Sequence, residues 1–280
     1  MTDVRIGAHR VPALIVRGDA RDSRWDAVAG EEPLQLRACG PGQDPVDVAV
    51  TMRTPGHEEE LALGFLLAEG LIDIADAAAA TFEFGDPTLL SQPHNEVLVR
   101  VPRPIDLAGV HERYFVATAS CGICGRASVD ELIARVETMV GGPTIGRSIL
   151  ATLPDAMRQA QAIFEDTGGL HAAALFTADG ELVELREDVG RHNAVDKLIG
   201  ARAIAAALPA DDAALLVSGR VSFEIVQKVA VARVPILCAV SAPSDLAVST
   251  AERLGMTLVG FLRGSGFNVY TGAERIDIEA

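Results

Sequence analysis

The chain has 280 residues, of which 49% are hydrophobic, 22% charged and only 4% aromatic, a composition typical of a compact, soluble protein with a core of small aliphatic side chains. Its formal net charge of -15 argues against general binding to a DNA or RNA backbone, whose phosphates it would repel. The sequence has neither a membrane span of roughly 18 apolar residues nor the basic start and apolar run of a secretory signal, so we expect a cytoplasmic protein.

The first part of the chain, to about residue 115, predicts a small α+β lobe. It begins with an irregular segment, rich in charge and glycine, through residues 20–32. A strand follows over residues 46–52, and the acidic run at residues 58–60 then opens a helix, because carboxylates suit the positive end of a helix dipole. Gly70 ends that helix. Alternating valines predict another strand over residues 97–101.

The second part predicts units of strand, loop and helix. The strands are expected over residues 213–217, 235–240, 257–261 and 267–270. A helix follows each of the first two, and Ser244 and Gly255 cap the second of these helices. This order predicts an α/β fold with a mixed, largely parallel sheet covered by helices.

Three loops of this sheet are candidates for a ligand site. They are residues 218–220 (Ser218, Gly219 and Arg220), residues 241–244, and residues 262–266 with Arg263. Loops that follow parallel strands meet at one edge, where open α/β sheets bind ligands, so we predict a nucleotide or phosphate site there. The alternative is that glycine and serine are present only because tight turns require them.

A polar helix start lies between these parts. Arg191 and Lys197 follow Gly190, and a helix N-terminus with nearby cations can receive phosphate or carboxylate. Glu187 and Asp188 immediately precede it, so a solvated, salt-bridged helix start is an equal alternative.

The chain also carries a Cys-x-x-Cys pair, Cys121 and Cys124, set between glycines. Two sulfurs at this spacing can form half of a tetrahedral zinc site, cycle as a dithiol and disulfide, or provide one reactive thiolate. A structural disulfide is not expected in the cytoplasm. The alternative is that both cysteines are small, buried side chains of the hydrophobic core without a chemical role.

Zinc chemistry is disfavoured because further ligands are missing. Cys39 and Cys238 are single and distant in sequence, and His171, followed by two alanines, is expected to be a packed histidine. A zinc deaminase needs His-x-Glu followed by Pro-Cys-x-x-Cys, and Ser120 stands where that proline would be. A thioredoxin-like exchanger normally has its motif after an early strand of a smaller domain. The remaining hypothesis is that Cys121 accepts sulfur as a persulfide, with Cys124 helping to release the sulfur or to hold the loop.

Several motifs together resemble the FdhD family of formate dehydrogenase accessory sulfurtransferases. They are residues 51–56 (TMRTPG), 63–70 (LGFLLAEG), 120–125 (SCGICG), 167–171 (TGGLH), 187–197 (EDVGRHNAVDK) and 218–220 (SGR). The resemblance implies a cytidine-deaminase-like α/β core in residues 116–280, carrying the Cys-x-x-Cys loop and a nucleotide cleft, with a smaller N-terminal lobe in residues 1–115. It also implies a homodimer.

The family resemblance also implies a function. Such a protein takes sulfur from a cysteine desulfurase and passes it to the molybdenum (or tungsten) bis-guanine-dinucleotide cofactor that formate dehydrogenase requires. Cys121 would carry the persulfide, with Cys124 as its auxiliary. The segment at the guanine nucleotide, which GDP is also expected to occupy, would be Phe261, Leu262, Arg263, Gly264, Ser265 and Gly266.

An acidic protein that binds several phosphates needs cations gathered locally. The candidates are Arg191, Lys197, Arg220 and Arg263, together with the backbone of Ser218 and Gly219. No structural zinc is expected. A rival function is that of a non-catalytic chaperone, which binds and delivers the cofactor without moving sulfur.

Overall fold

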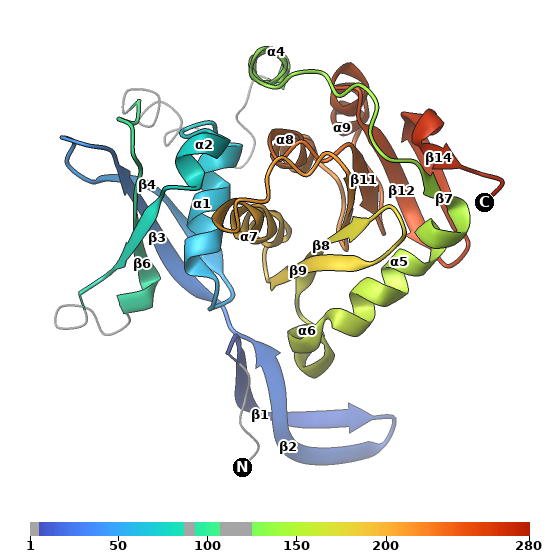
Figure 1. Cartoon of the computed structure of the whole chain (residues 1–280). Helices are drawn as coiled ribbons and strands as arrows, with labels where there is room; N and C mark the ends of the chain where they lie inside the picture. Colours follow the sequence, from blue (N-terminus) through green and yellow to red (C-terminus); the bar gives the residue numbers. More distant parts are fainter. Residues whose placement is uncertain (1–5, 87–92, 107–124) are drawn as a thin grey trace.

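The structure is a computed structural model that describes residues 6–86, 93–106 and 125–280. Cys121 and Cys124 lie outside the described residues. The described chain is a mixed α/β fold with a four-stranded N-terminal sheet, a six-stranded C-terminal sheet and two pairs of strands, joined by helices (Figure 1). None of the described helices is long and apolar enough to cross a membrane.

The N-terminal sheet has the strand order β4-β3-β6-β5. Its strands are β3 (Glu32–Cys39), β4 (Val46–Arg53), β5 (Thr81–Phe84) and β6 (Glu96–Arg100). Helix α1 (Glu58–Ala68) packs on it, and the short α2 (Ile74–Ala77) and η1 (Pro93–Asn95) lie in its connections. The predicted end of the helix is confirmed, because Gly70 adopts φ 69 and its N–H donates to the Leu67 carbonyl at 3.0 Å.

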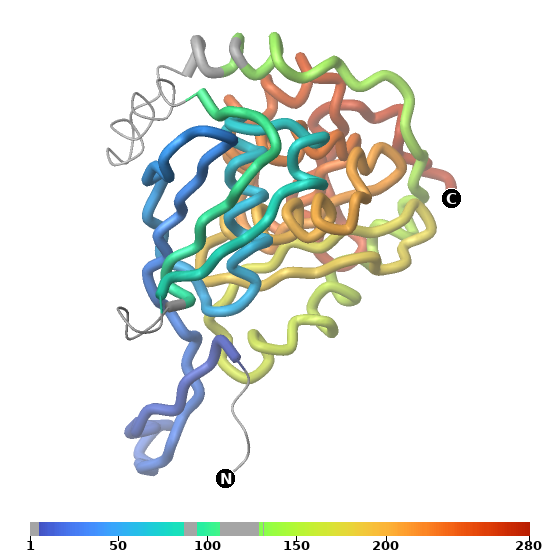
Figure 2. The backbone as a smooth tube through the Cα atoms, turned by 60° about the vertical axis from the view of Figure 1, so that its left-hand side comes forward, coloured from blue at the N-terminus to red at the C-terminus, as the bar shows by residue number. Residues whose placement is uncertain are grey.

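The predicted irregular segment over residues 20–32 is wrong. Strands β1 (Ala8–Arg17) and β2 (Ala20–Ala29) pair along their whole length as an antiparallel hairpin. The hairpin extends away from the body of the molecule, with α6 (Ala162–Thr167) at its base (Figures 1 and 2). The side chains of the hairpin are largely exposed on both faces. A strand without a buried face needs no alternation of apolar and polar residues, so the sequence gives little sign of it.

The C-terminal sheet has the strand order β13-β12-β11-β10-β8-β9. Its strands are β8 (His171–Thr177), β9 (Leu182–Asp188), β10 (Ala213–Val217), β11 (Ile236–Ala239), β12 (Thr257–Arg263) and β13 (Gly266–Thr271). Parallel pairing is confined to β10, β11 and β12, and an antiparallel hairpin flanks this group on each side. The sheet is therefore mixed, as predicted, but its parallel part is smaller than expected.

Both faces of the four central strands of this sheet, β8, β10, β11 and β12, are buried. Ala173 and Leu175 of β8 pack on the side of α7 (Arg191–Ile204), α8 (Phe223–Val231) and α9 (Asp245–Arg253). Ala174 and Phe176 point to the other side, toward α5 (Arg147–Ala160). The remaining elements are α4 (Gly125–Arg135), β7 (Ile145–Gly146), η2 (Ala273–Arg275) and β14 (Ile276–Asp277). Because the central strands are covered on both sides, their sequences are nearly continuous runs of apolar residues.

The N-terminal sheet and the C-terminal sheet share one hydrophobic core, which extends through α1 and α7. These two helices approach each other backbone to backbone at two glycines. A Cβ atom on Gly64 would lie 1.9 Å from the Asp196 carbonyl oxygen, and one on Gly200 would lie 1.8 Å from that of Glu60. The predicted division at residues 115/116 falls outside the described residues and stays a prediction.

Candidate functional site

The predicted loops meet at one edge of the six-stranded sheet, which we call the loop edge. The Val221 N–H donates to the Ala242 carbonyl at 3.2 Å, and the Ser244 N–H donates to that of Val221 at 2.9 Å. The Phe261 N–H donates to the Ser241 carbonyl at 3.1 Å. These bonds join the segments after β10 and β11 to the end of β12, as the parallel order requires.

The third segment differs from the expected loop. Residues 261–263 belong to β12, and only Gly264 and Ser265 form the turn to β13. The pairing with β13 shifts register between Gly260 and Arg263, and Phe261 adopts φ 54. This irregularity exposes the Phe261 side chain, whereas that of Leu262 is buried in the core. Leu262 can therefore offer a ligand only its backbone.

Three helices begin at the loop edge. The residues that precede them are Gly190 before α7, Ser222 before α8 and Ser244 before α9. The cap predicted at Ser244 is confirmed, because its Oγ accepts the Ala247 N–H at 3.2 Å. Helix N-termini carry unpaired N–H groups and positive partial charge, so this edge suits an anion.

The antiparallel strand β8 brings His171 to the same edge. Ser218 Oγ accepts the Ala172 N–H at 2.9 Å and lies 3.4 Å from His171 Nδ1. A Cβ on Gly219 would lie 3.4 Å from both His171 Nδ1 and Arg191 Cδ, so the loop passes close beneath these two side chains. The sequence predicted only a packed histidine here, because nothing in it shows that β8 runs against β10.

Arginines supply the local positive charge at the loop edge. Arg191 is the first residue of α7 and is half-buried, and its Nε atom makes no hydrogen bond to any described residue. Arg220 is exposed on the loop after β10. Arg263 is also exposed, and its Nε donates to the Val240 carbonyl at 2.8 Å. The predicted arginines thus lie on three separate segments of the loop edge: the start of α7, the loop after β10 and the end of β12.

Lys197, predicted as a fourth cation for the ligand, lies inside the protein instead. Its side chain is 1% exposed, and its Nζ lies 2.7 Å from Asp188 Oδ2 and donates to the Thr54 carbonyl at 2.8 Å. Burial lowers the pKa of Lys197, and the Asp188 charge opposes that shift. Because these partners occupy the ammonium group, the expectation that it receives a phosphate at the loop edge is corrected.

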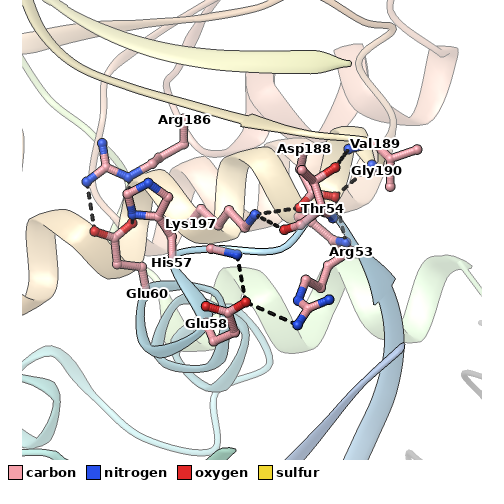
Figure 3. A network of polar contacts seen from close by, with 12 residues as sticks. Arg53, Thr54, His57, Glu58, Glu60, Arg186, Asp188, Val189, Gly190 and Lys197 are labelled. Carbon is pink, nitrogen blue, oxygen red and sulfur yellow. Dashed lines mark hydrogen bonds and ion pairs between the residues drawn. The ribbon is translucent and has the colours of Figure 1, made fainter. Parts of the chain in front are cut away.

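Asp188 connects the N-terminal lobe to the start of α7 (Figure 3). Its carboxylate accepts the N–H groups of Thr54 at 3.1 Å and Gly190 at 2.8 Å, and the Asn193 side-chain amide at 3.0 Å. Thr54 Oγ1 in turn accepts the Val189 N–H at 3.1 Å. These bonds fix the residue that precedes α7, and therefore the place from which Arg191 projects.

A second ion cluster lies at the same junction (Figure 3). Arg186 Nη2 donates to Glu60 Oε1 at 2.7 Å, and His57 Nδ1 lies 3.1 Å from Glu60 Oε2. Burial alone would raise the pKa of Glu60, but the hydrogen bonds from Arg186 and His57 outweigh it and lower the pKa to about 2. Glu60 therefore stays ionised and ties α1 to β9 at neutral pH.

We expect Lys197→Met to destabilise the protein by about 3 kcal/mol, because it leaves the buried Asp188 carboxylate without its counter-ion. The measurement is urea denaturation. The matched control is Arg253→Met, which breaks an exposed ion pair with Asp130 and is expected to cost less than about 1 kcal/mol. Equal stability of the two variants would contradict a structural role for Lys197.

The two described cysteines do not offer reactive thiols. Cys39 and Cys238 are free and buried, and burial raises the pKa of Cys238 to about 12. Among the described residues, no group of three or more His, Cys, Asp or Glu side chains could hold a metal ion. The thiol chemistry predicted from the sequence therefore depends on Cys121 and Cys124.

Comparison with known proteins identifies the family. The sequence profile of the FdhD/NarQ family matches residues 29–277. The chain belongs to the FdhD/NarQ family. The family match covers both large sheets, the loop edge and the Asp188 junction, whereas all but the last residue of the β1–β2 hairpin precedes it.

Relatives in the FdhD/NarQ family align over nearly the whole chain. The Sulfur carrier protein FdhD of Streptomyces avermitilis is 46% identical over 276 residues, which cover 97% of this chain and 96% of the relative. That of Sulfurisphaera tokodaii is 45% identical over 268 residues, covering 95% and 98%. A crystal structure assigned to a formate dehydrogenase accessory protein of Desulfotalea psychrophila superposes with a TM-score of 0.71 at 23% identity, covering 96% of this chain and 99% of its own, and shows the same fold.

Proposed function

We propose that this FdhD/NarQ protein is a sulfur carrier that accepts sulfur as a persulfide on Cys121 from a cysteine desulfurase. It passes the sulfur to the molybdenum (or tungsten) bis-guanine-dinucleotide cofactor, which formate dehydrogenase requires. The observation that carries the proposal is the 46% identity to a Sulfur carrier protein FdhD over 97% of the chain. In this role the protein works in the cytoplasm as a homodimer, with the desulfurase and formate dehydrogenase as partners.

The chemistry proposed for the thiols balances without an external oxidant. The Cys121 thiolate attacks the terminal sulfur of the donor persulfide, an S–S bond forms at Cys121, and the donor leaves as a thiolate. The Cys124 thiolate then attacks Cys121, forming a disulfide between them and releasing hydrosulfide for the metal centre. The two thiolates supply the two electrons that reduce the transferred sulfur.

The loop edge is the proposed cofactor cleft. Three helices begin there, and Arg191, Arg220 and Arg263 come from segments at that edge, in a chain whose net charge is -15. The turn at Gly264 and Ser265 and the adjoining Gly266 are exposed, and the exposed ring of Phe261 offers a stacking surface for a guanine base. Gly219 brings the loop backbone close to Arg191, and the neighbouring Ser218 Oγ lies 3.4 Å from His171 Nδ1.

We expect Arg220→Ala to weaken GDP binding by about tenfold or more, because a hydrogen bond to a charged group contributes about 1.5–3 kcal/mol. Persulfide formation on Cys121 should be unaffected. Isothermal titration calorimetry with GDP measures the binding. The control is Arg253→Ala, another exposed arginine, at the end of α9. Unchanged affinity of Arg220→Ala would count against the loop edge as the nucleotide cleft.

The rival function is a chaperone that binds the cofactor without moving sulfur. The observation in its favour is that the described residues of the loop edge, which come from β8, α7 and the segments after β10, β11 and β12, already supply the proposed anion contacts without a thiol. Replacement of Cys121 decides between the two functions.

A further inference from the structure

Two histidines at the loop edge have no part in the function proposed above. His171 opens β8 and His192 is the second residue of α7. His171 Nδ1 lies 3.4 Å from Ser218 Oγ, and His192 Nε2 lies 3.3 Å from Ser222 Oγ. The two serines flank the loop that carries Gly219 and Arg220. Each histidine is therefore held against the loop that the proposed ligand contacts.

Burial, together with nearby positive charge, lowers the pKa of both histidines. Burial lowers the pKa of His171, as does the Arg191 charge, against the opposing effect of Asp188. The pKa of His192 falls to about 4 through burial and through the charges of Arg191 and Lys228, with Glu224 opposing them and His171 adding to them. Asp188 is itself paired with Lys197 at 2.7 Å.

The hydrogen bonds around Ser222 leave one nitrogen of His192 free to accept a proton. The Ser222 hydroxyl bonds to the Glu224 carboxylate, so Ser222 Oγ receives the Nε2–H of His192. In this assignment, made from the hydrogen-bond network, Nδ1 of the neutral ring carries a lone pair. Protonation at Nδ1 would give His192 a second N–H donor.

We propose that His171 and His192 contact the anion that Arg191 receives, and that binding of a phosphate group at the loop edge is coupled to proton uptake by these histidines. This inference rests on the proposed nucleotide cleft. The buried Nε of Arg191 has no partner among the described residues, and the Arg191 side chain and His171 Nδ1 both lie against Gly219 of the loop. An anion there offsets the positive charge that disfavours the imidazolium form. Bound phosphate and protonated histidine therefore stabilise each other.

The coupling predicts a defined pH dependence. Proton uptake on binding means that the histidine pKa is higher in the complex than in the free protein, so affinity rises as the pH falls through the pKa of the complex. Uptake of one proton per GDP raises the affinity by at most about tenfold for each unit by which the pH falls, so we expect a rise of several-fold between about pH 8 and about pH 6. GDP itself titrates near pH 6, because the second pKa of a phosphate group lies there, so the comparison must be made against a variant.

The experiment is calorimetry of GDP binding at about pH 7 in two buffers of different ionisation enthalpy, which gives the number of protons taken up per GDP. We expect His192→Gln and His171→Gln to take up fewer protons than the wild type and to lose part of the rise in affinity at low pH. The control is His94→Gln, whose exposed ring packs on Phe84 in the N-terminal lobe. Equal proton uptake by wild type and both loop-edge variants would overturn the inference.

A second measurement does not depend on how well the variants fold. NMR titration of the six histidines in the wild-type protein, with and without GDP, measures their pKa values directly. A rise at His171 or His192 on binding supports the inference. If GDP binds and both pKa values stay unchanged, the proton coupling is overturned but the proposed nucleotide cleft is not. If GDP does not bind, the proposed cleft is overturned as well.

Discussion

Replacing Cys121 by alanine is expected to abolish sulfur transfer while leaving GDP binding within about twofold of the wild type. A persulfide needs a thiolate to carry it, and the two thiols that the structure describes are poor substitutes. Cys39 and Cys238 are buried, and burial raises the pKa of Cys238 to about 12, so little sulfur should be added to either of them. The measurement is peptide mass spectrometry after incubation with a cysteine desulfurase and L-cysteine, without reductant.

The wild-type peptide containing Cys121 should gain one sulfur atom, and the variant should not. Cys124→Ala is the matched control, because it keeps the carrier thiol and should retain the adduct even if release is impaired. Formate dehydrogenase activity in a deletion strain provides the second readout. If the Cys121→Ala variant restores that activity, Cys121 has no place in the mechanism. If the wild type gains no sulfur although a control shows that the desulfurase is active, the chaperone function is favoured.

The second large effect is expected at the contact between α1 and α7. Gly200→Ala should destabilise the protein by more than about 3 kcal/mol, or prevent folding, because overpacking against a backbone cannot be relieved by a side-chain rotation. The added Cβ would lie 1.8 Å from the Glu60 carbonyl oxygen. The better helix propensity of alanine returns only about 1 kcal/mol.

Thermal and urea unfolding measure the effect of Gly200→Ala. Gly169→Ala is the control, since a Cβ there meets its nearest neighbour, Ala29 Cβ, at an ordinary 3.4 Å. Gly64→Ala tests the same contact from the other helix and should behave like Gly200→Ala, because its Cβ would lie 1.9 Å from the Asp196 carbonyl oxygen. A stable Gly200→Ala variant would show that the two helices can separate without loss of the core.

Local signals predicted the second part of the chain well. The apolar runs became β10 and β11, and Ser244 and Gly255 bound α9 as expected. These features depend on neighbours in sequence, such as a hydroxyl that caps a helix or a glycine that adopts positive φ. The prediction of an irregular segment before β3 was wrong because that segment depends on a partner strand and not on a local signal. Its regularity comes from pairing with β1, while its side chains stay exposed.

The sequence by itself determined the family, the strands and helices from β10 to β13, and the loops that meet at the loop edge. Only the tertiary structure decided which charged groups are available there. Lys197 and Arg191 lie on the same helix, yet packing against the N-terminal lobe buries Lys197 beside Asp188 and leaves Arg191 half-exposed. His171 joins the edge because β8 runs antiparallel to β10. The burial of a charge and the direction of a strand depend on partners distant in sequence, which no local pattern specifies.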